Sequence, residues 1–374
     1  MQSRVVLREM DAERGPAGII CFLEDADEVG IAAYVNSAGE CYWTLPYSHW
    51  AHALIRPLQT HVDIQRRANA QDVWTTIGSY LVVDHDSTED DTVFYGDDYL
   101  SLFANSLTAL ETHYTDIEPW EIIRTEAQAA ITQNNDTPTV QNPDSRLGFV
   151  TVGRIDGVIG GIDNDGIDPI TIDTSDQSRL DFMVQVASTL DDRLPQLRVS
   201  AEPFEFEFCM HPGVDHPDMA LLYGDKVDSF RLRGGYGAMA TTTKAVAQAL
   251  AGVTVLYSTQ TPVDTSLYGI SEKAVLFNNV PNQASLDRRT LYAAKQAAQL
   301  NRDLALSIVS GAMAPFDGYA LLDSFPVTIH RGRVDLDSAY YTIWGLEWIG
   351  HRNGSETLRP ALQPRRDPPA RTGS

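Results

Sequence analysis

The stretch from Ser324 to Ile349 constrains the fold most, because apolar and polar residues alternate over two consecutive segments. The first segment is 325–331 and the second is 341–349, with the polar connection 332–338 between them. A period of two residues is typical of strands that bury one face. We therefore predict two neighbouring strands in this stretch.

A weaker copy of this pattern lies near the N-terminus. There Val62-Asp-Ile-Gln-Arg66 precedes Tyr80-Leu-Val-Val83, much as Val327-Thr-Ile-His-Arg331 precedes Tyr341-Thr-Ile343. The valine and the tyrosine are 18 residues apart in the first case and 14 in the second. Such a short match can arise by chance, so it supports a duplicated β-domain only as a hypothesis.

The length of 374 residues allows two to four domains, and 43% apolar residues suit a globular chain. No apolar run approaches the ~20 residues that a membrane-spanning helix requires. The segment 1–15 is too charged for a signal peptide. We expect neither a membrane-spanning segment nor export by such a signal.

The formal net charge is −23, and only four lysines occur, namely Lys226, Lys244, Lys273 and Lys295. This balance argues against a nucleic-acid-binding protein, because phosphate contacts require concentrated Lys and Arg. Repulsion between acidic groups is screened at high salt. We therefore favour a high-salt (halophilic) host, and a GC-rich genome, which prefers Arg to Lys, is the alternative.

The N-terminal region, up to about residue 112, is predicted to be β-rich. Turn signals separate its strands, and the acidic segment 84–91 is expected to be a solvated hairpin tip rather than a cation site. With one short helix near 48–55, this pattern fits a small barrel or sandwich. The predicted strands are 18–23, 29–35, 40–45, 61–66, 74–83 and 92–95.

Helices and strands alternate in the rest of the chain. A capping-box pattern predicts a helix from Thr115, with Pro119 in its first turn, and Ser178 begins a second helix. We also expect a short helix at 240–251 and a long one capped by Ser285. The predicted strands are 197–200, 204–208, 227–232, 253–257, 273–277 and 304–308.

These elements predict a mainly β, multidomain α+β protein. The expected parts are an N-terminal β-barrel domain at 1–114, a helix-containing α+β domain at 115–200, a β-rich central domain at 201–284, a C-terminal helix with a β-barrel part at 285–358, and a disordered tail at 359–374.

The strongest metal-site candidate is Cys209-x-His211-x-x-x-Asp215-His216, since these residue types can bind zinc. It lacks the usual paired spacing and contains a Pro-Gly turn, so a strand end and loop is the favoured interpretation. Segment 163–168 loosely resembles a calcium loop without the bidentate twelfth-position Glu, so we expect a surface turn.

Other candidates are weaker. Segment 234–237 is glycine-rich but lacks the dinucleotide-binding fingerprint, and a flexible turn is expected. Cys21 and Cys41 could bridge a hairpin, although buried free thiols are the favoured interpretation. No catalytic motif, metal site or cofactor site is predicted.

Four arginines near the C-terminus stand out on an acidic protein. They could form a docking arm for an acidic partner, but a flexible solvated end is the commoner explanation. The residues are Arg359, Arg365, Arg366 and Arg371.

The order of these patterns resembles the tail hub (baseplate hub, or minor tail protein) of long-tailed viruses of bacteria and archaea. Segments 39–46, 54–58, 62–64, 78–82 and 96–102 are similar to that family's first domain. The passage 180–208 is similar to its central domain. Its last domain is matched by 267–269, 273–277, the helix from Ser285, the strand at Leu304 and the pair at Val327 and Tyr341.

The resemblance implies a homotrimer with two tail-tube-like β-barrels per chain, flanking smaller α+β domains. Three such chains would form a pseudo-sixfold ring that matches a hexameric tail tube. Strands 62–66 and 327–331 would then contribute to interfaces. The implied partners are the tail tube protein, the distal tail protein, the tape-measure protein and tail fibres.

The implied location is the virion tail tip (baseplate), after synthesis in the host cytoplasm, with roles in host attachment and genome delivery. DNA would meet the protein only in transit, and an acidic lumen would not retain it. No enzymatic role is expected, since no lysozyme or peptidase domain is apparent. The alternatives are a tail-associated cell-envelope hydrolase and a receptor-binding or distal tail protein.

Overall fold

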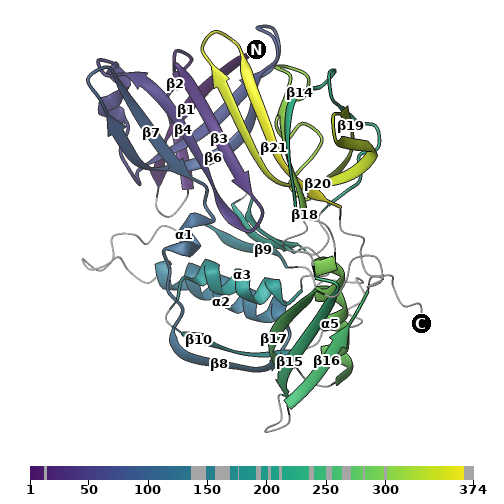
Figure 1. Ribbon diagram of the computed structural model, residues 1–374. Coiled ribbons are helices and arrows are strands. Elements are labelled where there is room, and N and C mark those ends of the chain that lie inside the picture. Colours follow the sequence, from purple (N-terminus) through teal and green to yellow (C-terminus); the bar gives the residue numbers. More distant parts are fainter. Residues whose placement is uncertain are drawn as a thin grey trace.

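The computed structural model describes residues 1–11, 15–135, 149–155, 169–175, 177–190, 195–200, 204–209, 213–235, 240–249, 255–262, 271–280, 283–298 and 301–365. Within these residues the protein is mainly β and multidomain, which confirms the predicted fold class. One large sheet forms the upper layer in Figure 1, and helices with three small sheets lie below it.

The first seven strands form what we call the N-terminal β-unit. Their order in the sheet is β2-β1-β5-β6-β7-β4-β3, and every neighbouring pair is antiparallel. The expected short helix is a 3-10 turn, η1 (Trp50–Leu54). The strands are β1 (Gln2–Asp11), β2 (Gly15–Leu23), β3 (Glu28–Tyr34), β4 (Ser37–Pro46), β5 (Thr60–Arg67), β6 (Thr75–Ser87) and β7 (Asp91–Asp97).

Six later strands form the C-terminal β-unit, with the order β14-β18-β21-β20-β19-β13. The two predicted strands of the most constrained stretch are present as β19 and β20, which pair in antiparallel fashion. The strands are β13 (Leu221–Leu222), β14 (Val227–Gly235), β18 (Asn301–Ile308), β19 (Ser324–Arg331), β20 (Val334–His351) and β21 (Glu356–Pro364).

The prediction of a disordered tail from residue 359 is wrong for its first part. Segment 356–364 is strand β21, which lies between β18 and β20, and Leu358 and Leu362 are each 2% exposed. Two prolines within 360–364 made this segment look unstructured, because proline cannot donate a hydrogen bond within a sheet. The alternation of buried and exposed residues was the stronger signal.

A helical domain follows the N-terminal β-unit. Helices α2 and α3 pack on each other between the β8–β10 pair and the sheet β11-β12-β9 (Figure 1). Its core includes Phe182, Phe206 and Phe208, all fully buried. The elements are α1 (Ser101–Ala104), β8 (Leu110–Ile117), α2 (Pro119–Asn135), β9 (Thr151–Ile155), β10 (Ile170–Ser175), α3 (Arg179–Ser188), β11 (Gln196–Val199) and β12 (Glu205–Cys209).

Of the two helix starts predicted in this domain, the one at Ser178 is confirmed and the one at Thr115 is wrong. Ser178 caps α3, since its side chain accepts a hydrogen bond from the Asp181 amide. Thr115 is not a cap, because it lies within β8, and the helix begins at Pro119. Proline suits this first position because its missing N–H would have no partner inside the helix.

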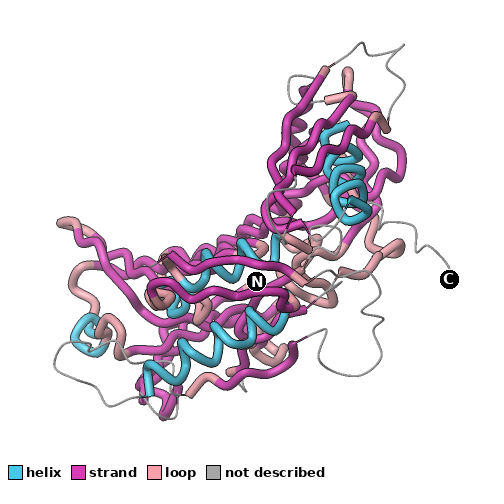
Figure 2. The backbone as a smooth tube through the Cα atoms, turned by 90° about the horizontal axis from the view of Figure 1, so that it is seen from below, coloured by secondary structure: helices cyan, strands magenta, loops and turns pink. Residues whose placement is uncertain are grey.

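A smaller insert separates β14 from β18. It contains the sheet β16-β15-β17 with α5 packed on one face, and Figure 2 shows α5 at the opposite end of the molecule from α2 and α3. The proposed boundary at 284/285 is therefore wrong, because it would separate α5 from its sheet. The elements are β15 (Thr242–Ala249), β16 (Val255–Gln260), β17 (Glu272–Val280) and α5 (Gln283–Ala298).

The expected short helix at 240–251 is strand β15. Alanine-rich composition favoured a helix, but Thr243, Ala245 and Ala247 are buried while Lys244 and Val246 are exposed. This alternation places one face of the strand against α5. Pairing with two neighbouring strands overrides the weak helix propensity.

We predict that Leu362→Ala destabilises the protein by about 2–5 kcal/mol, because it leaves a cavity in the core of the C-terminal β-unit. Ala361→Ser, at the exposed neighbouring position, should change the free energy of unfolding by less than about 0.5 kcal/mol. Urea denaturation of both variants measures the difference. Equal effects would contradict the assignment of 356–364 as a central strand.

Candidate assembly interface

Strand β20 of the C-terminal β-unit connects the two β-units. On one edge, 334–342 pairs with β19 and 345–351 pairs with β3 of the N-terminal β-unit. On its other edge, 341–350 pairs with β21. The two β-units therefore share one continuous thirteen-stranded sheet (Figure 1).

A buried ion pair lies where the two β-units meet. Arg66 of β5 donates from Nε and Nη2 to the two carboxylate oxygens of Glu356, each at 2.9 Å. The same carboxylate accepts hydrogen bonds from Trp348 Nε1 at 3.1 Å and from the Gly311 amide at 3.1 Å. The side chains of Arg66 and Glu356 are 9% and 3% exposed. These contacts join strands that are 290 residues apart in the sequence.

The environment of Glu356 favours its charged form. Burial alone would raise the pKa of this carboxyl, but hydrogen bonds from Arg66 and Trp348 hold the pKa below its usual value. An ion pair with two parallel N–H···O bonds is both strong and geometrically specific. The junction thus fixes the position of one β-unit against the other.

The two β-units share the topology of their main strands, although β2 has no counterpart in the C-terminal β-unit. In chain order, β1, β3, β4, β5, β6 and β7 correspond to β13, β14, β18, β19, β20 and β21. Four antiparallel contacts of the N-terminal β-unit have counterparts in the C-terminal β-unit. The contacts β3·β4, β4·β7, β6·β7 and β5·β6 correspond in that order to β14·β18, β18·β21, β20·β21 and β19·β20. The contact that differs is β13·β19, which is parallel where β1·β5 is antiparallel. The hypothesis of a duplicated β-domain is therefore supported by topology.

Two irregular features recur at matching places. Strand β6 carries an extra residue, Val83, against β7, and β20 carries an extra residue, Trp344, against β21. The carbonyl before each bulge accepts a hydrogen bond from a leucine amide. Both leucines, Leu58 and Leu322, have positive φ, at 59° and 72°. Non-glycine residues rarely adopt this conformation, so its repetition strengthens the correspondence.

The matching bulges also test the sequence echo. When the two β-units are aligned at these bulges, Tyr80 of β6 corresponds to Tyr341 of β20. Val62 is opposite Tyr80, but Phe325 is opposite Tyr341, so Val327 is displaced by two residues. The tyrosines were correctly matched, whereas the valine–isoleucine–arginine motifs are out of register.

The predicted interface strands lie largely inside the protein. Val62, Ile64, Val327 and Ile329 are fully buried in the shared core. Arg66 reaches the junction, and the spacing of the motif gave no signal that its partner would be Glu356. Arg331, at the end of β19, is exposed and lies 5.8 Å from the ring of Tyr223.

A second buried network reinforces the N-terminal β-unit. Asp63 accepts hydrogen bonds from Arg8 Nε at 2.9 Å and Ser79 Oγ at 2.7 Å, and its other contacts are to His61. Burial would raise the pKa of Asp63, but the His61 and Ser79 hydrogen bonds lower it. His61 is 1% exposed and also contacts Tyr99. Because Asp63 and His61 are buried, we assign the network a role in stabilising the fold.

The suspected zinc ligands do not converge among the described residues. Cys209 is buried in β12, His216 pairs with Asp323 at 2.8 Å, and Asp215 pairs with Arg365 at 2.8 Å. No cluster of metal-ligating side chains occurs in the described part of the chain. His211 lies outside it.

Other predicted positions have simple placements. Cys21 and Cys41 are free thiols, and Arg359 pairs with Glu347 across β21 and β20. Gly234 and Gly235 end β14. Segments 163–168, 236–237 and 267–269, with Arg366 and Arg371, lie outside the described residues.

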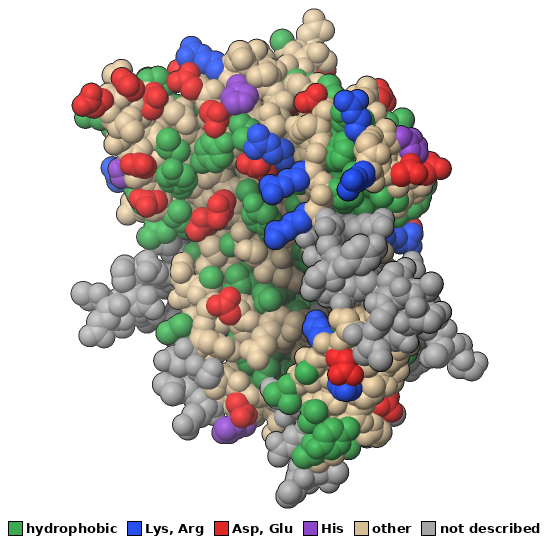
Figure 3. All heavy atoms as spheres, viewed as in Figure 1, with side chains coloured by type: hydrophobic (Ala, Val, Ile, Leu, Met, Phe, Trp, Pro, Cys, Tyr) green, Lys and Arg blue, Asp and Glu red, His purple; other side chains and the backbone are tan. Residues whose placement is uncertain are grey.

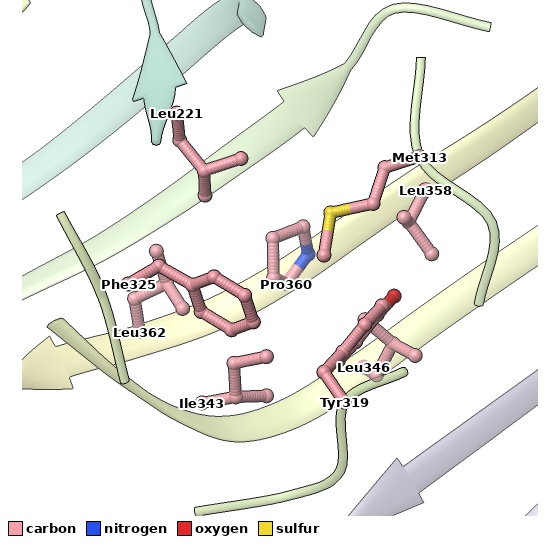
Figure 4. A pocket seen from close by; sticks show the side chains of 9 residues that line it. All are labelled: Leu221, Met313, Tyr319, Phe325, Ile343, Leu346, Leu358, Pro360 and Leu362. Carbon is pink, nitrogen blue, oxygen red and sulfur yellow. The ribbon is translucent and has the colours of Figure 1, made fainter. Parts of the chain in front are cut away.

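The apolar interior of the C-terminal β-unit leaves no space for a water molecule. Figure 4 shows side chains from β13, β19, β20 and β21 filling this space together with two loop residues. A small ligand has no room there. The lining residues are Leu221, Met313, Tyr319, Phe325, Ile343, Leu346, Leu358, Pro360 and Leu362.

No helix among the described residues is long and apolar enough to cross a membrane.

No family model and no curated protein matches the sequence. Solved structures do match. The 43 kDa tail protein of prophage MuSo2 from Shewanella oneidensis is 12% identical with a TM-score of 0.63, and the match covers 96% of this chain and 98% of that one.

Two further structures agree. The tail protein from Neisseria meningitidis MC58 is 8% identical with a TM-score of 0.62, covering 97% of both chains. Prophage tail protein gp18 from Listeria monocytogenes EGD-e is 8% identical with a TM-score of 0.57, covering 98% of this chain and 95% of that one. The chain therefore has the fold of phage tail proteins over almost its whole length.

The junction ion pair yields a prediction. Glu356→Gln should destabilise the protein by about 3–5 kcal/mol, because it leaves the buried Arg66 charge uncompensated. Adding Arg66→Met should recover much of this loss. Glu347→Gln, in the exposed pair with Arg359, should cost less than about 1 kcal/mol. Denaturant unfolding of the single and double variants measures these terms, and additive losses would contradict coupling.

A second prediction concerns pH. Asp98 follows β7 and accepts hydrogen bonds from the Gly39 and Leu100 amides at 2.7 and 2.9 Å. Burial raises its pKa to about 6, although these donors oppose the shift. The folded state therefore binds more protons than the unfolded state between about pH 4 and 6, and stability from this group falls as pH rises through that range.

In Asp98→Asn this contribution is absent. The wild type should lose roughly 2 kcal/mol relative to the variant between pH 4 and pH 7. Unfolding curves at several pH values measure the difference. If the stability of the wild type and of the variant changed with pH in parallel, the pKa of Asp98 would be the same in the folded and unfolded states, which would contradict the prediction.

Proposed function

We propose that this chain is a structural protein of a virus tail, acting as the hub at the tail tip or baseplate. In this role it would join the tail tube to distal tail, tape-measure and fibre proteins and take part in host attachment and genome delivery. The observation that carries the proposal is the duplication of one β-unit within a chain that has the fold of phage tail proteins.

The duplication has a geometric use. Closed assemblies of identical chains have rotational symmetry, so three copies give a threefold ring. Since each copy carries two β-units of similar topology, the ring would present six similar units. Such a trimer could contact a sixfold tail tube through similar contacts at every position. DNA would pass through its lumen, and the excess of acidic residues would limit retention of the phosphate backbone.

The mass of the assembled protein tests this role. We expect a trimer by native mass spectrometry and light scattering, with measurements repeated at about 1 M salt, where charge repulsion is screened. A hexamer would instead support a tail tube or distal tail protein, and a monomer at every concentration and salt level would contradict a hub. Clearing of cell-wall substrate, lost on changing one acidic residue, would favour the hydrolase alternative.

A further inference from the structure

The contact between the two β-units inside one chain is made by one strand from each unit. Each of these strands has a counterpart in the other unit, so a similar contact can form between chains. Within the chain, β20 of the C-terminal β-unit pairs with β3 of the N-terminal β-unit. The counterparts of these strands are β6 and β14. If the β-units alternate around a ring, the next contact must join β6 of one chain to β14 of another.

Strand β6 has a free edge at the required place. Its pairing with β5 ends at Leu81, which corresponds to Thr342, the last β20 residue paired with β19. Beyond that point, 84–87 pairs with β7 on one edge and with no described strand on the other. In β20 the corresponding segment, 345–348, uses that second edge to pair with β3.

Strand β14 supplies the other free edge. It ends the large sheet and pairs only with β18 among the described strands. Its residues Arg231 and Arg233 are exposed, whereas their counterparts in β3, Gly30 and Ala32, are buried and half-buried in the strand that pairs with β20. An open edge with exposed backbone groups is a ready site for strand addition.

We propose that β14 of one subunit pairs antiparallel with 84–87 of β6 in a second copy of this chain. The register follows from the internal contact, in which Glu347 is opposite Ala32. The counterpart of Glu347 is Asp86 and the counterpart of Ala32 is Arg233. In the proposed contact, Asp86 therefore lies opposite Arg233. The inference rests on the proposed ring and adds the surfaces and the register that would close it.

The charges on the two edges are complementary. The end of β6 and the turn after it carry Asp84, Asp86, Glu89 and Asp90, whereas β14 carries Arg231 and Arg233. In Figure 3, acidic side chains gather over the side of the upper layer that holds β6 and β7, and Lys and Arg gather toward β14, β18 and β21. Opposite charges directly across an antiparallel pair stabilise it, and like charges weaken it.

The junction ion pair points to the same contact. Glu356 begins β21, and counting from the matched pairs its counterpart is Asp90, the residue just before β7. Arg66 lies at the end of β5, and the residue at its position in β19 is Ile329, two residues before the exposed Arg331. The acidic β6–β7 tip of one subunit would thus approach the end of β19 in the next, where Arg331 is exposed.

Disulfide trapping tests the register. In a Cys21→Ser background, chains carrying Arg233→Cys are mixed with chains carrying Asp86→Cys and then oxidised. Opposed Cα atoms lie about 4.5–5.5 Å apart, within reach of a disulfide. We expect covalent dimers from the mixture and covalent trimers when both changes are in one chain. Ser229→Cys with Asp86→Cys is the control, because Ser229 is exposed on the same strand but displaced by about 13 Å.

Charge exchange provides a second test. Arg233→Glu and Asp86→Arg should each raise the concentration for half-assembly by about tenfold or more at ~0.1 M salt, and their combination in one chain should restore it. A native trimer without the 233–86 disulfide, or equal trapping in the control, would overturn this pairing and leave the proposed hub role intact. A persistent monomer would overturn both.

Discussion

The rest of the structure depends on the pairing of β20 with β3. Without that pairing, both β-units would expose a long strand edge, and a free edge invites unwanted association. Because β20 is 18 residues long, its two ends can serve different neighbours while its middle stays paired with β21. The helical domain and the insert can then be accommodated between strands without breaking the large sheet.

The Arg66–Glu356 ion pair gives this pairing its register. Removing two charges from water is costly, so burial of the pair does not in itself imply a large gain in stability. The carboxylate is satisfied only when Arg66, Trp348 and the Gly311 amide all reach it. A slip of β20 against β3 would separate Arg66, which lies in the N-terminal β-unit, from Glu356. We therefore regard specificity as the main contribution of the ion pair.

The sequence predicted the elements whose signals are local. Alternation located β19 and β20, and the hydroxyl of Ser178 located the start of α3. It failed where distant strands decide the outcome. β15 is a strand because β16 and β17 flank it, and β21 is ordered because β18 and β20 flank it. Alanine and proline content alone cannot report such neighbours.

The duplicated domain also shows which features the sequence can and cannot predict. The short motif at Val62 and Val327 suggested a repeat, yet it is displaced by two residues in the structure. What recurs is backbone geometry, namely the bulges at Val83 and Trp344 and the left-handed leucines before β5 and β19. Geometry of this kind can persist while side chains change, because many residues fit the same strand positions. The partner of Arg66 was equally beyond reach, since 290 residues separate it from Glu356.

Charge placement would reconcile a strongly acidic chain with the proposed self-assembly. A net charge of −23 opposes association of identical subunits, most strongly at low salt. In the proposed ring, the exposed arginines on β14 and the acids at the end of β6 would make attraction local to two edges, while the rest of the surface would keep subunits apart. Charged residues on free edges also hinder pairing with unrelated strands. The same side chains can therefore protect a free subunit and select its neighbour, provided that the two edges differ, as a ring of head-to-tail contacts requires.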